Sequence, residues 1–419
     1  MTQTEYMDKL LLWHPYTQHG FGERIIHVSS ASGAYIFLSD GGKLLDAISS
    51  WWVNIHGHSH PVIAEAIATQ AKRLDHVMFA GFTHEPAVTL ASLLIGGARD
   101  SGAGVSRVFY SDNGSTAVEV ALKLAYQFHI NGGERRRSRF LALRHAYHGD
   151  TFGAMAAGEP EGFHSVFRPL LPTVDFVNPG DLDALRALLR TRGGEYAAFI
   201  FEPLLQGAGG MRIYQKDFLK EAMDLCWADG ILTIADEVFT GFYRTGKRFA
   251  FEHAGISPDM IVLSKGITGG FMPLGATLVS EDIYSAFYAE DMRLAFLHGH
   301  SYTANPIACA AAVASWGLLE DASCQQRIAK ISEITAERTT SLCDSGLGMN
   351  ARCFGTIGAV ELKGGPDYFS AARRDIVDKA TELGVLLRPL GKVIYAVPPF
   401  CVTDDEVNRI YDVMAELLA

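Results

Sequence analysis

The sequence lacks three features that mark common protein classes: paired cysteines, a long apolar run and a surplus of basic residues. Its six cysteines are scattered without a Cys-x-x-Cys pair, which argues against a zinc ribbon or a disulfide framework and favours reduced thiols. The longest apolar stretch, Pro306–Leu319, is too short to cross a bilayer as a helix. A net charge of −11 argues against a sequence-independent nucleic-acid or anionic-membrane surface.

Targeting, repeat and metal-binding patterns are also missing from the sequence. Met1–Lys9 has no basic region followed by an apolar one, so we see no signal peptide and expect a cytoplasmic protein. No internal repeat or low-complexity linker is visible. His56, His58 and His60 lie in a turn without nearby cysteine or carboxylate ligands, whereas zinc usually takes four ligands at recognisable spacings. We therefore expect no metal site.

The length and the strand pattern predict an α/β protein with two domains. A chain of 419 residues exceeds what one small core organises. Across 51–305, apolar strands alternate with helical patterns, which indicates a large domain with a mostly parallel central sheet covered on both faces. After Asn305-Pro306 the pattern changes to a smaller α+β domain at 306–419. We expect the irregular segment 1–50 to join that smaller domain.

Two apolar runs each end on one charged residue. Thr233–Val238 contains Asp236 and Val262–Gly266 contains Lys265, and burying either charge without a partner is costly. A pyridine-ring cofactor such as pyridoxal phosphate (PLP) supplies both partners, because it needs an anion at its ring nitrogen and an amine for its aldehyde. A simple ion pair between neighbouring strands is the alternative interpretation.

Other polar groups follow strands of the same predicted sheet, where ligands of parallel sheets bind. Gly114 and Ser115 open a helix whose free amides suit a phosphate, and Thr116 with Glu119 fits a capping box. A plain helix cap is the alternative for this segment. Tyr147 follows another strand, and it either lies flat on a planar cofactor or is a half-buried loop aromatic.

Three further features bear on the same predicted site. Val238 lies two residues beyond Asp236 on the same strand face, so it can cover one cofactor face while Tyr147 covers the other. Glu202 and Gln206 leave a buried strand and are expected to orient neighbouring groups. Gly207–Gly210 lacks the lysine and the spacing of a P-loop, so we interpret it as a backbone turn.

The ordered motifs resemble the class III aminotransferases of PLP fold type I from about residue 11 to the C-terminus. They are Gly114-Ser115, Tyr147–Asp150, Glu202-Pro203, Asp236–Gly241, Arg244–Gly246 and Lys265-Gly266. The resemblance implies that Lys265 is the Schiff-base lysine and proton carrier and that Asp236 pairs with the pyridinium. It also implies that Gly114 and Ser115 bind the cofactor phosphate and that Tyr147 and Val238 contact the ring.

The resemblance further implies a homodimer with shared active sites. In this family a threonine of a His-Gly-Pro-Thr motif completes the phosphate site of the second subunit. The corresponding stretch here is His298–Ser301, so Ser301 would supply the hydroxyl while His300 replaces the proline. Gly299 of the same stretch is expected at the substrate. Tyr243 stands where the family more often has glycine, which predicts a narrower site.

Four more motifs resemble the members of this family that act in biotin biosynthesis: Trp13–Thr17, Ser49–Trp52, Gln206–Met211 and Arg388–Tyr395. The resemblance implies S-adenosylmethionine as the amino donor and 8-amino-7-oxononanoate as the acceptor, in two half-reactions. Seven residues are expected to bind substrate. Arg388 is the expected clamp for the acceptor carboxylate, and Lys265 and Gly299 are expected to contact the substrate beside the cofactor. The remaining four form an aromatic wall: Tyr16, Trp51, Trp52 and Tyr147.

Several alternatives stay open at this point. The tryptophan pair fits core packing as well as a substrate wall. Lysine-dependent synthesis of diaminopelargonate, an ω-amino acid transaminase and an aminomutase all fit the same scaffold. A non-catalytic PLP-binding regulator is disfavoured, because such proteins usually carry a basic DNA-binding domain and this acidic chain begins almost directly with the fold.

Overall fold

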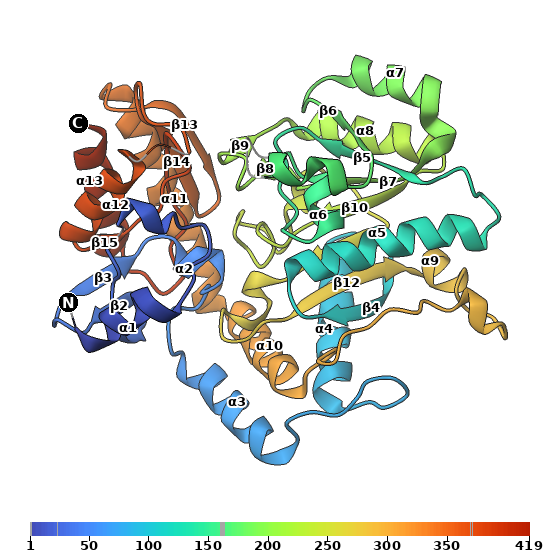
Figure 1. The fold of residues 1–419 in the computed structure, drawn as a ribbon, viewed down its shortest axis with the longest axis horizontal. Helices are drawn as coiled ribbons and strands as arrows, with labels where there is room; N and C mark the ends of the chain where they lie inside the picture. The colour runs from blue at the N-terminus through green and yellow to red at the C-terminus, as the bar shows by residue number, and fades with distance from the viewer. Residues whose placement is uncertain (1, 23, 160–163, 369, 371) are drawn as a thin grey trace. The chain divides into compact units, whose positions relative to one another are not determined.

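The computed structural model describes residues 2–22, 24–159, 164–368, 370 and 372–419 (Figure 1). The chain forms two compact units: unit 1 contains Met1–His60 and Lys330–Ala419, and unit 2 contains Pro61–Ala329. We predicted boundaries at 50 and 305, and the structure places them at different residues. The helix that follows Pro306 packs against helices of unit 2, so the boundary falls after it rather than before it.

Unit 2 is built on a seven-stranded sheet of order β4-β12-β11-β10-β7-β5-β6. Strands β11, β10, β7, β5 and β6 run parallel, whereas β12 is antiparallel to both β11 and β4. The strand bounds are β4 Val105–Ser111, β5 Arg139–Leu143, β6 Val174–Val177, β7 Tyr196–Phe201, β10 Leu232–Asp236, β11 Met260–Leu263 and β12 Gly275–Ser280. The predicted mostly parallel central sheet of the α/β class is confirmed.

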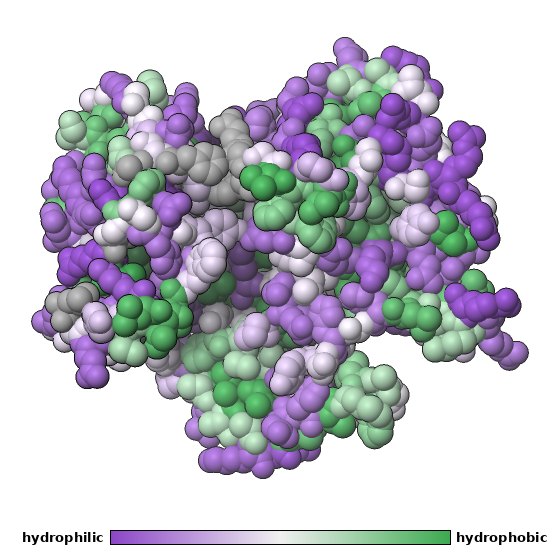
Figure 2. Space-filling model, viewed as in Figure 1, coloured by the Kyte–Doolittle hydropathy of each residue, from purple (hydrophilic) through white to green (hydrophobic). Residues whose placement is uncertain are grey.

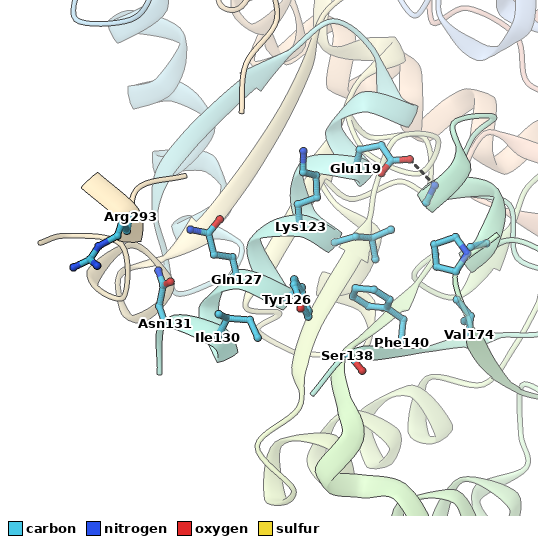
Figure 3. Close-up of a pocket in the computed structure, with 14 residues that line it drawn as sticks. Glu119, Lys123, Tyr126, Gln127, Ile130, Asn131, Ser138, Phe140, Val174 and Arg293 are labelled. Carbon is cyan, nitrogen blue, oxygen red and sulfur yellow. Dashed lines mark hydrogen bonds between the residues drawn. The ribbon is translucent and has the colours of Figure 1, made fainter. Parts of the chain in front are cut away.

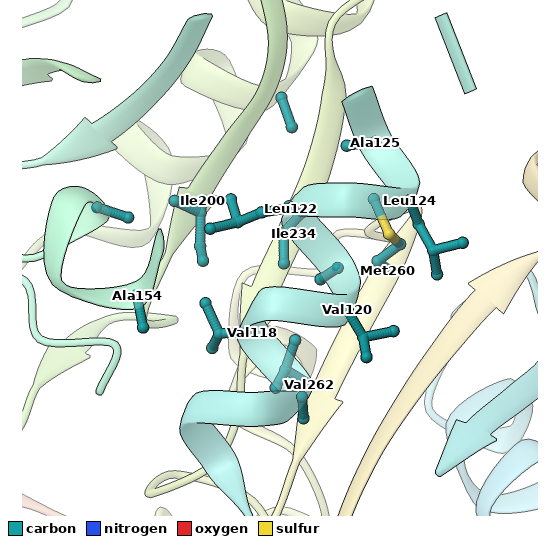
Figure 4. Close-up of a cluster of buried hydrophobic side chains, with 14 of the residues drawn as sticks. Val118, Val120, Leu122, Leu124, Ala125, Ala154, Ile200, Ile234, Met260 and Val262 are labelled. Carbon is teal, nitrogen blue, oxygen red and sulfur yellow. The ribbon is translucent and has the colours of Figure 1, made fainter. Parts of the chain in front are cut away.

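Several helices of unit 2 pack against the sheet. The helices of this unit are α3 Pro61–Arg73, α4 Glu85–Asp100, α5 Gly114–Asn131, α6 Phe152–Ala157, α7 Leu182–Arg192, α8 Lys216–Ala228, α9 Glu281–Ser285 and α10 Pro306–Leu319, and the unit also has a short hairpin of β8 Leu205–Gln206 and β9 Arg212–Ile213. Helices α4, α5, α6, α8 and α9 contact strands of the sheet directly. Figure 4 shows the core under α5, where Val118 and Leu122 lie against Ile200, Ile234 and Val262 of three parallel strands. This packing fixes the start of α5 beside the strand ends.

Unit 1 is made from both ends of the chain. Its first sheet has the order β1-β2-β3-β15, in which β3 and β15 are parallel, and its second has the order β13-β14-β16. The strands are β1 Val28–Ser32, β2 Tyr35–Leu38, β3 Lys43–Asp46, β13 Met349–Phe354, β14 Ile357–Glu361, β15 Val385–Leu386 and β16 Val393–Ala396. Its helices are α1 Gln3–Leu11, α2 Ser49–Trp52, α12 Ala372–Glu382 and α13 Asp404–Leu418, and α11 Ala322–Asp344 runs across the boundary with unit 2.

The surface in Figure 2 is mostly hydrophilic, with apolar side chains exposed in several separate places. Within the described ranges, no single helix has the length and apolar content needed to cross a membrane. Helices α10 and α11 meet that test when taken together, but the pair is bent by 72°.

Candidate active site

Asp236 is the last residue of β10 and its side chain is only 4% exposed. One carboxylate oxygen lies 2.7 Å from Nδ1 of His148, and the other accepts the Val238 amide at 3.0 Å. The carboxylate is therefore directed at His148. The sequence reasoning missed His148 because it assigned the chemistry of that loop to Tyr147 alone. The signal was present, since an imidazole follows one strand end while a buried carboxylate closes a neighbouring parallel strand.

The second ring nitrogen of His148, Nε2, lies in a buried environment. The His148 side chain is fully buried, and Nε2 has no hydrogen-bond partner among the described residues. A buried polar atom without a partner is costly, so such atoms are uncommon away from binding sites. Asp236 and His148 thus form a buried acid–imidazole pair at the carboxyl ends of the strands, which is where ligands of parallel sheets bind.

Lys265 follows β11 by two residues and opens a short 3₁₀ helix with a positive φ of 46°. Burial lowers the pKa of its amine to about 8, although the negative charges of Asp236 and Glu202 oppose the shift. Arg244 adds a smaller lowering effect. A lowered pKa raises the fraction of free amine near neutral pH, and the free amine is the form that attacks an aldehyde.

The start of α5 lies beside Val238 and Ser264, which are close to Asp236 and Lys265 in the chain. A side chain at Gly114 would place its Cβ 2.8 Å from Cγ1 of Val238 and 3.6 Å from Cβ of Ser264, so glycine is required where these segments meet. Ser115 Oγ accepts the Asp150 amide at 3.1 Å, which joins the helix start to the Tyr147–Asp150 turn. The structure therefore brings together the cofactor residues that we predicted in unit 2, Ser301 excepted.

One detail of this helix start was predicted wrongly. The capping box is formed by Asn113 and Thr116, each side chain accepting the other's backbone amide at 3.0 Å. Glu119, which we had paired with Thr116, instead accepts the Gly153 amide at 2.6 Å. The cap lies earlier because α5 begins at Gly114, directly after the turn that ends β4.

Glu202 supports the loop that carries Tyr147. Its carboxylate accepts the Tyr147 amide at 3.0 Å and the Gly207 amide at 2.9 Å, which confirms the predicted orienting role. Burial raises the pKa of Glu202 to about 7, and the charge of Asp236 adds to the rise. Gln206 donates to the Arg144 carbonyl at 2.7 Å, and the Tyr147 ring stacks on His164 at 6.0 Å.

In unit 1, three of the predicted substrate residues lie together. The Tyr16 and Trp51 rings meet edge to face at 5.4 Å, and the Arg388 guanidinium carbon lies 5.0 Å from the Trp51 ring centre. Arg388 also donates to the Tyr16 carbonyl at 3.4 Å. The two tryptophans differ: Trp51 is 40% exposed, whereas Trp52 is 4% exposed and donates to the Tyr395 hydroxyl at 3.2 Å. Core packing therefore describes Trp52.

Both tryptophans belong to a left-handed turn of non-glycine residues. Ser49, Ser50, Trp51 and Trp52 have φ values of 49°, 43°, 74° and 72°. Helical hydrogen bonds close the turn, because the Trp52 amide donates to Ile48 O at 2.8 Å and the Val53 amide to Ser49 O at 2.9 Å. Left-handed helical backbone costs roughly 1–2 kcal/mol per L-residue, so this segment stores considerable strain. Conformational strain of this kind gathers at functional sites.

The stretch His298–Ser301 is the predicted contribution to a second subunit. Gly299 and Ser301 are exposed. His300 anchors the stretch through a contact of 2.9 Å between its Nδ1 and an Asp112 carboxylate oxygen, and His298 contacts Lys123 at 2.9 Å. Tyr243, the other departure from the family pattern, donates to Glu320 at 3.4 Å.

A separate pocket of about 520 Å³ lies along α5, and Figure 3 shows its lining. Lys123, Gln127 and Arg293 contribute polar groups, and Tyr126 and Phe140 contribute rings. None of the predicted site residues lines it. In the described part of the chain, no three histidine, cysteine or acidic side chains are grouped to hold a metal.

Known proteins resemble this chain over nearly its whole length. The model of the aminotransferase class-III family matches residues 16–418. The adenosylmethionine-8-amino-7-oxononanoate aminotransferase from Synechococcus elongatus is 45% identical to this chain, and the match covers 97% of this chain and 98% of that protein. The enzyme of the same name from Helicobacter pylori is 36% identical, and the match covers 98% of this chain and 97% of that protein.

Solved structures of aminotransferases also resemble this chain. The crystal structure of adenosylmethionine-8-amino-7-oxononanoate aminotransferase from Methanocaldococcus jannaschii has a TM-score of 0.93 at 33% identity, covering 99% of this chain and 98% of that one. A PLP-bound amine transaminase from an uncultivated Pseudomonas species has a TM-score of 0.91 at 31% identity, covering 97% and 98%. The chain belongs to the class III aminotransferases, with the PLP type I fold.

Proposed function

We propose that this aminotransferase moves the amino group of S-adenosylmethionine to 8-amino-7-oxononanoate in biotin biosynthesis, with PLP as its cofactor. The observation that carries the substrate assignment is the 45% identity, over 97% of the chain, to a relative named for this pair of substrates. The exposed Trp51 beside Arg388 supports it, because a long keto acid needs an apolar wall and a clamp for its carboxylate.

The residues of unit 2 fit PLP. Asp236 would face the ring nitrogen, Lys265 would hold the aldehyde carbon, and the start of α5 at Gly114 and Ser115 would bind the phosphate through its free amides. Val238 and Tyr147 would cover the two ring faces. When bound, PLP supplies an electron sink for the charge left at a substrate carbon that loses its proton.

The chain's own groups have distinct tasks in this proposal. His148 holds the Asp236 carboxylate in place, so that the anion is fixed where the ring nitrogen would lie. Lys265 has an amine with a pKa near 8, which suits a group that takes up and returns a proton near neutral pH. Glu202 fixes the backbone of Tyr147 and thereby the position of its ring.

We extend the proposal to substrate contacts in unit 1. Arg388 binds the acceptor carboxylate with its guanidinium fork, and Tyr16 and Trp51 line the aliphatic chain. The same rings attract the sulfonium of the donor by a cation–π interaction of roughly 0.5–2 kcal/mol. Trp52 supports Trp51 from the core through Tyr395.

We also propose a cytoplasmic homodimer in which Ser301 and Gly299 of one copy complete the site of the other. The exposure of both residues supports this arrangement, because it leaves the Ser301 hydroxyl open to a second copy. All six cysteines lie in the described residues and none forms a disulfide, as suits a reducing compartment.

The decisive experiment follows the visible absorbance of the PLP-loaded enzyme in single-turnover mixtures. We expect S-adenosylmethionine to convert the cofactor to its amine form, and 8-amino-7-oxononanoate to restore the original spectrum. If lysine converts the cofactor and S-adenosylmethionine does not, the donor assignment is wrong. If 8-amino-7-oxononanoate fails to restore the spectrum while a small ω-oxo acid succeeds, the acceptor assignment is wrong.

A further inference from the structure

The strained turn that carries Trp51 rests on a buried carboxylate. Asp46 ends β3 and is fully buried. Its Oδ1 accepts the Ile48 amide at 3.1 Å, and its Oδ2 accepts the Ser50 hydroxyl at 2.8 Å. The same Oδ2 lies 2.9 Å from Nε2 of His58. One carboxylate therefore binds a residue before the turn, a residue within it and a residue after it.

No sequence pattern connects these groups. We found no carboxylate near the histidine cluster of 56–60, and the structure supplies Asp46 because the chain folds back on itself after the turn. Asn54 lies within reach as well, with its Nδ2 3.4 Å from Nδ1 of His58. His58 is thus held on both ring nitrogens.

The return of the chain to Asp46 is itself tightly fixed. The backbone of His58 exchanges two hydrogen bonds with Gly33, at 2.7 and 3.1 Å. Gly57 has a φ of 86°, and a Cβ there would lie 2.5 Å from the sulfur of Cys401 and 2.8 Å from Gly33 O. Only glycine fits this position, so the place of the His58 ring is set by the backbone.

The combination of serine, histidine and aspartate does not make a nucleophile here. The Ser50 hydroxyl donates to Asp46, while His58 Nε2 faces the same carboxylate oxygen and lies 3.5 Å from Ser50 Oγ. A general base must be free to take the hydroxyl proton, with its other nitrogen oriented by the acid. In this arrangement the nitrogen that would do so is occupied, so the cluster has a different task.

We propose that Asp46, Ser50 and His58 are positioning residues that hold the left-handed turn, and that they thereby set the position of the Trp51 indole beside Tyr16 and Arg388. Strained backbone persists only where its surroundings over-determine it, and this network is part of the local structure that does so. Trp52 is anchored separately by Tyr395, so loss of the network moves Trp51 most. The consequence for substrate affinity rests on the proposed function, whereas the consequence for the turn does not.

The test compares His58→Leu with His58→Gln in the PLP-loaded enzyme. Glutamine places a nitrogen close to where histidine has Nε2, so it keeps the hydrogen bond to Asp46, and leucine removes it. The first readout is hydrogen exchange at the amides of Trp52 and Val53, which close the turn. We expect exchange to be about tenfold faster or more in His58→Leu and to stay near the wild-type rate in His58→Gln.

The second readout is steady-state kinetics. In His58→Leu we expect KM for both substrates to rise roughly tenfold while kcat changes little, as when binding shared by ground and transition states is lost. The absorbance of the bound cofactor and its dissociation constant should not change, because the network belongs to unit 1 and the cofactor residues to unit 2.

Thr403→Ala is the matched control. It removes the capping box of α13 in unit 1, so it lowers stability without touching the turn. If exchange at Trp52 and Val53 is as fast in Thr403→Ala as in His58→Leu, the proposal is overturned, because general destabilisation would then explain both results. Unchanged exchange in His58→Leu would also overturn it, as would faster exchange with unchanged KM. If neither substrate reacts with the wild-type enzyme, the proposed function fails while the exchange result still decides the role of the network.

Discussion

The two units place their functional side chains on different kinds of structure. In unit 2, Asp236 ends a regular strand, Lys265 follows another, and Gly114 begins a long helix. In unit 1, Trp51 lies on four consecutive left-handed residues held by a buried carboxylate. The proposed cofactor residues thus use the ordinary ends of secondary structure, whereas the proposed substrate wall uses backbone that is unfavourable on its own.

The largest effect should come from the cofactor side. Lys265→Ala removes the amine that would hold the cofactor and move the proton, so we expect activity to become undetectable, a loss beyond the roughly 10²–10⁴-fold of proton transfer alone. The visible absorbance of the lysine-bound cofactor should disappear from the purified protein. Lys330→Ala, a substitution in an exposed ion pair, is the control. A Lys265→Ala enzyme that retains both absorbance and turnover would contradict the assignment.

Arg388 tests the substrate side. Arg388→Ala should raise KM for 8-amino-7-oxononanoate by roughly 10- to 100-fold, because a hydrogen bond to a charged group contributes about 1.5–3 kcal/mol. Arg388→Lys should recover only part of the loss, since an ammonium lacks the bidentate fork. Cofactor affinity, measured by titration of the apoenzyme, should stay constant in both. An equal loss of cofactor affinity would contradict the assignment of substrate binding to unit 1 and cofactor binding to unit 2.

His148 sharpens the comparison from within unit 2. His148→Ala frees the Asp236 carboxylate from its 2.7 Å contact, so we expect roughly tenfold weaker cofactor binding with an unfolding midpoint near that of wild type. His148→Asn places a donor close to the original Nδ1 and should restore most of the affinity. Fluorescence titration with PLP measures both. Equal affinity in wild type and His148→Ala would show that Asp236 needs no support.

The pKa of Lys265 predicts a pH dependence for cofactor capture. A pKa lowered by burial to about 8 means that the free amine appears at lower pH than for an exposed lysine. The rate at which apoenzyme captures PLP should therefore rise with pH through about 8, by about fivefold between pH 7 and pH 8. Stopped-flow absorbance gives this rate. A midpoint above pH 10 would mean that burial does not act on this amine.

Ser50 gives the smallest expected effect and separates strain from hydrogen bonding. Ser50→Ala loses the hydroxyl that donates to Asp46 and keeps a Cβ on left-handed backbone. Ser50→Gly loses the same hydroxyl but accepts a φ of 43° without strain, so it should be more stable than the alanine variant by about 1 kcal/mol. Urea unfolding measures the difference. An alanine variant as stable as the glycine variant would show that the turn is not strained at this position.

The sequence predicted which residues of unit 2 come together at the strand ends because its signals are local. Asp236, Lys265 and Gly114 each follow an apolar strand, and parallel strand ends meet at one edge of a sheet. His148 was missed although it stands next to Tyr147 and contacts Asp236, because the chemistry of that loop was assigned to Tyr147 alone. The left-handed turn could not be predicted either, since neither serine nor tryptophan favours positive φ and the residues that hold it are brought there by tertiary structure.

Unit 1 is built from both ends of the chain, and this has a consequence for the order of folding. Strand β3 pairs with β15, and the Ser49 hydroxyl donates to the carbonyl of Val397, 348 positions later in the chain. A ribosome therefore releases the Trp51 segment early and its supporting strands last, after all of Pro61–Ala329 has been made. Because distant contacts form slowly and domains fold as units, we expect the nascent chain to complete unit 2 first. The segment around Trp51 then remains incompletely folded until translation is almost finished.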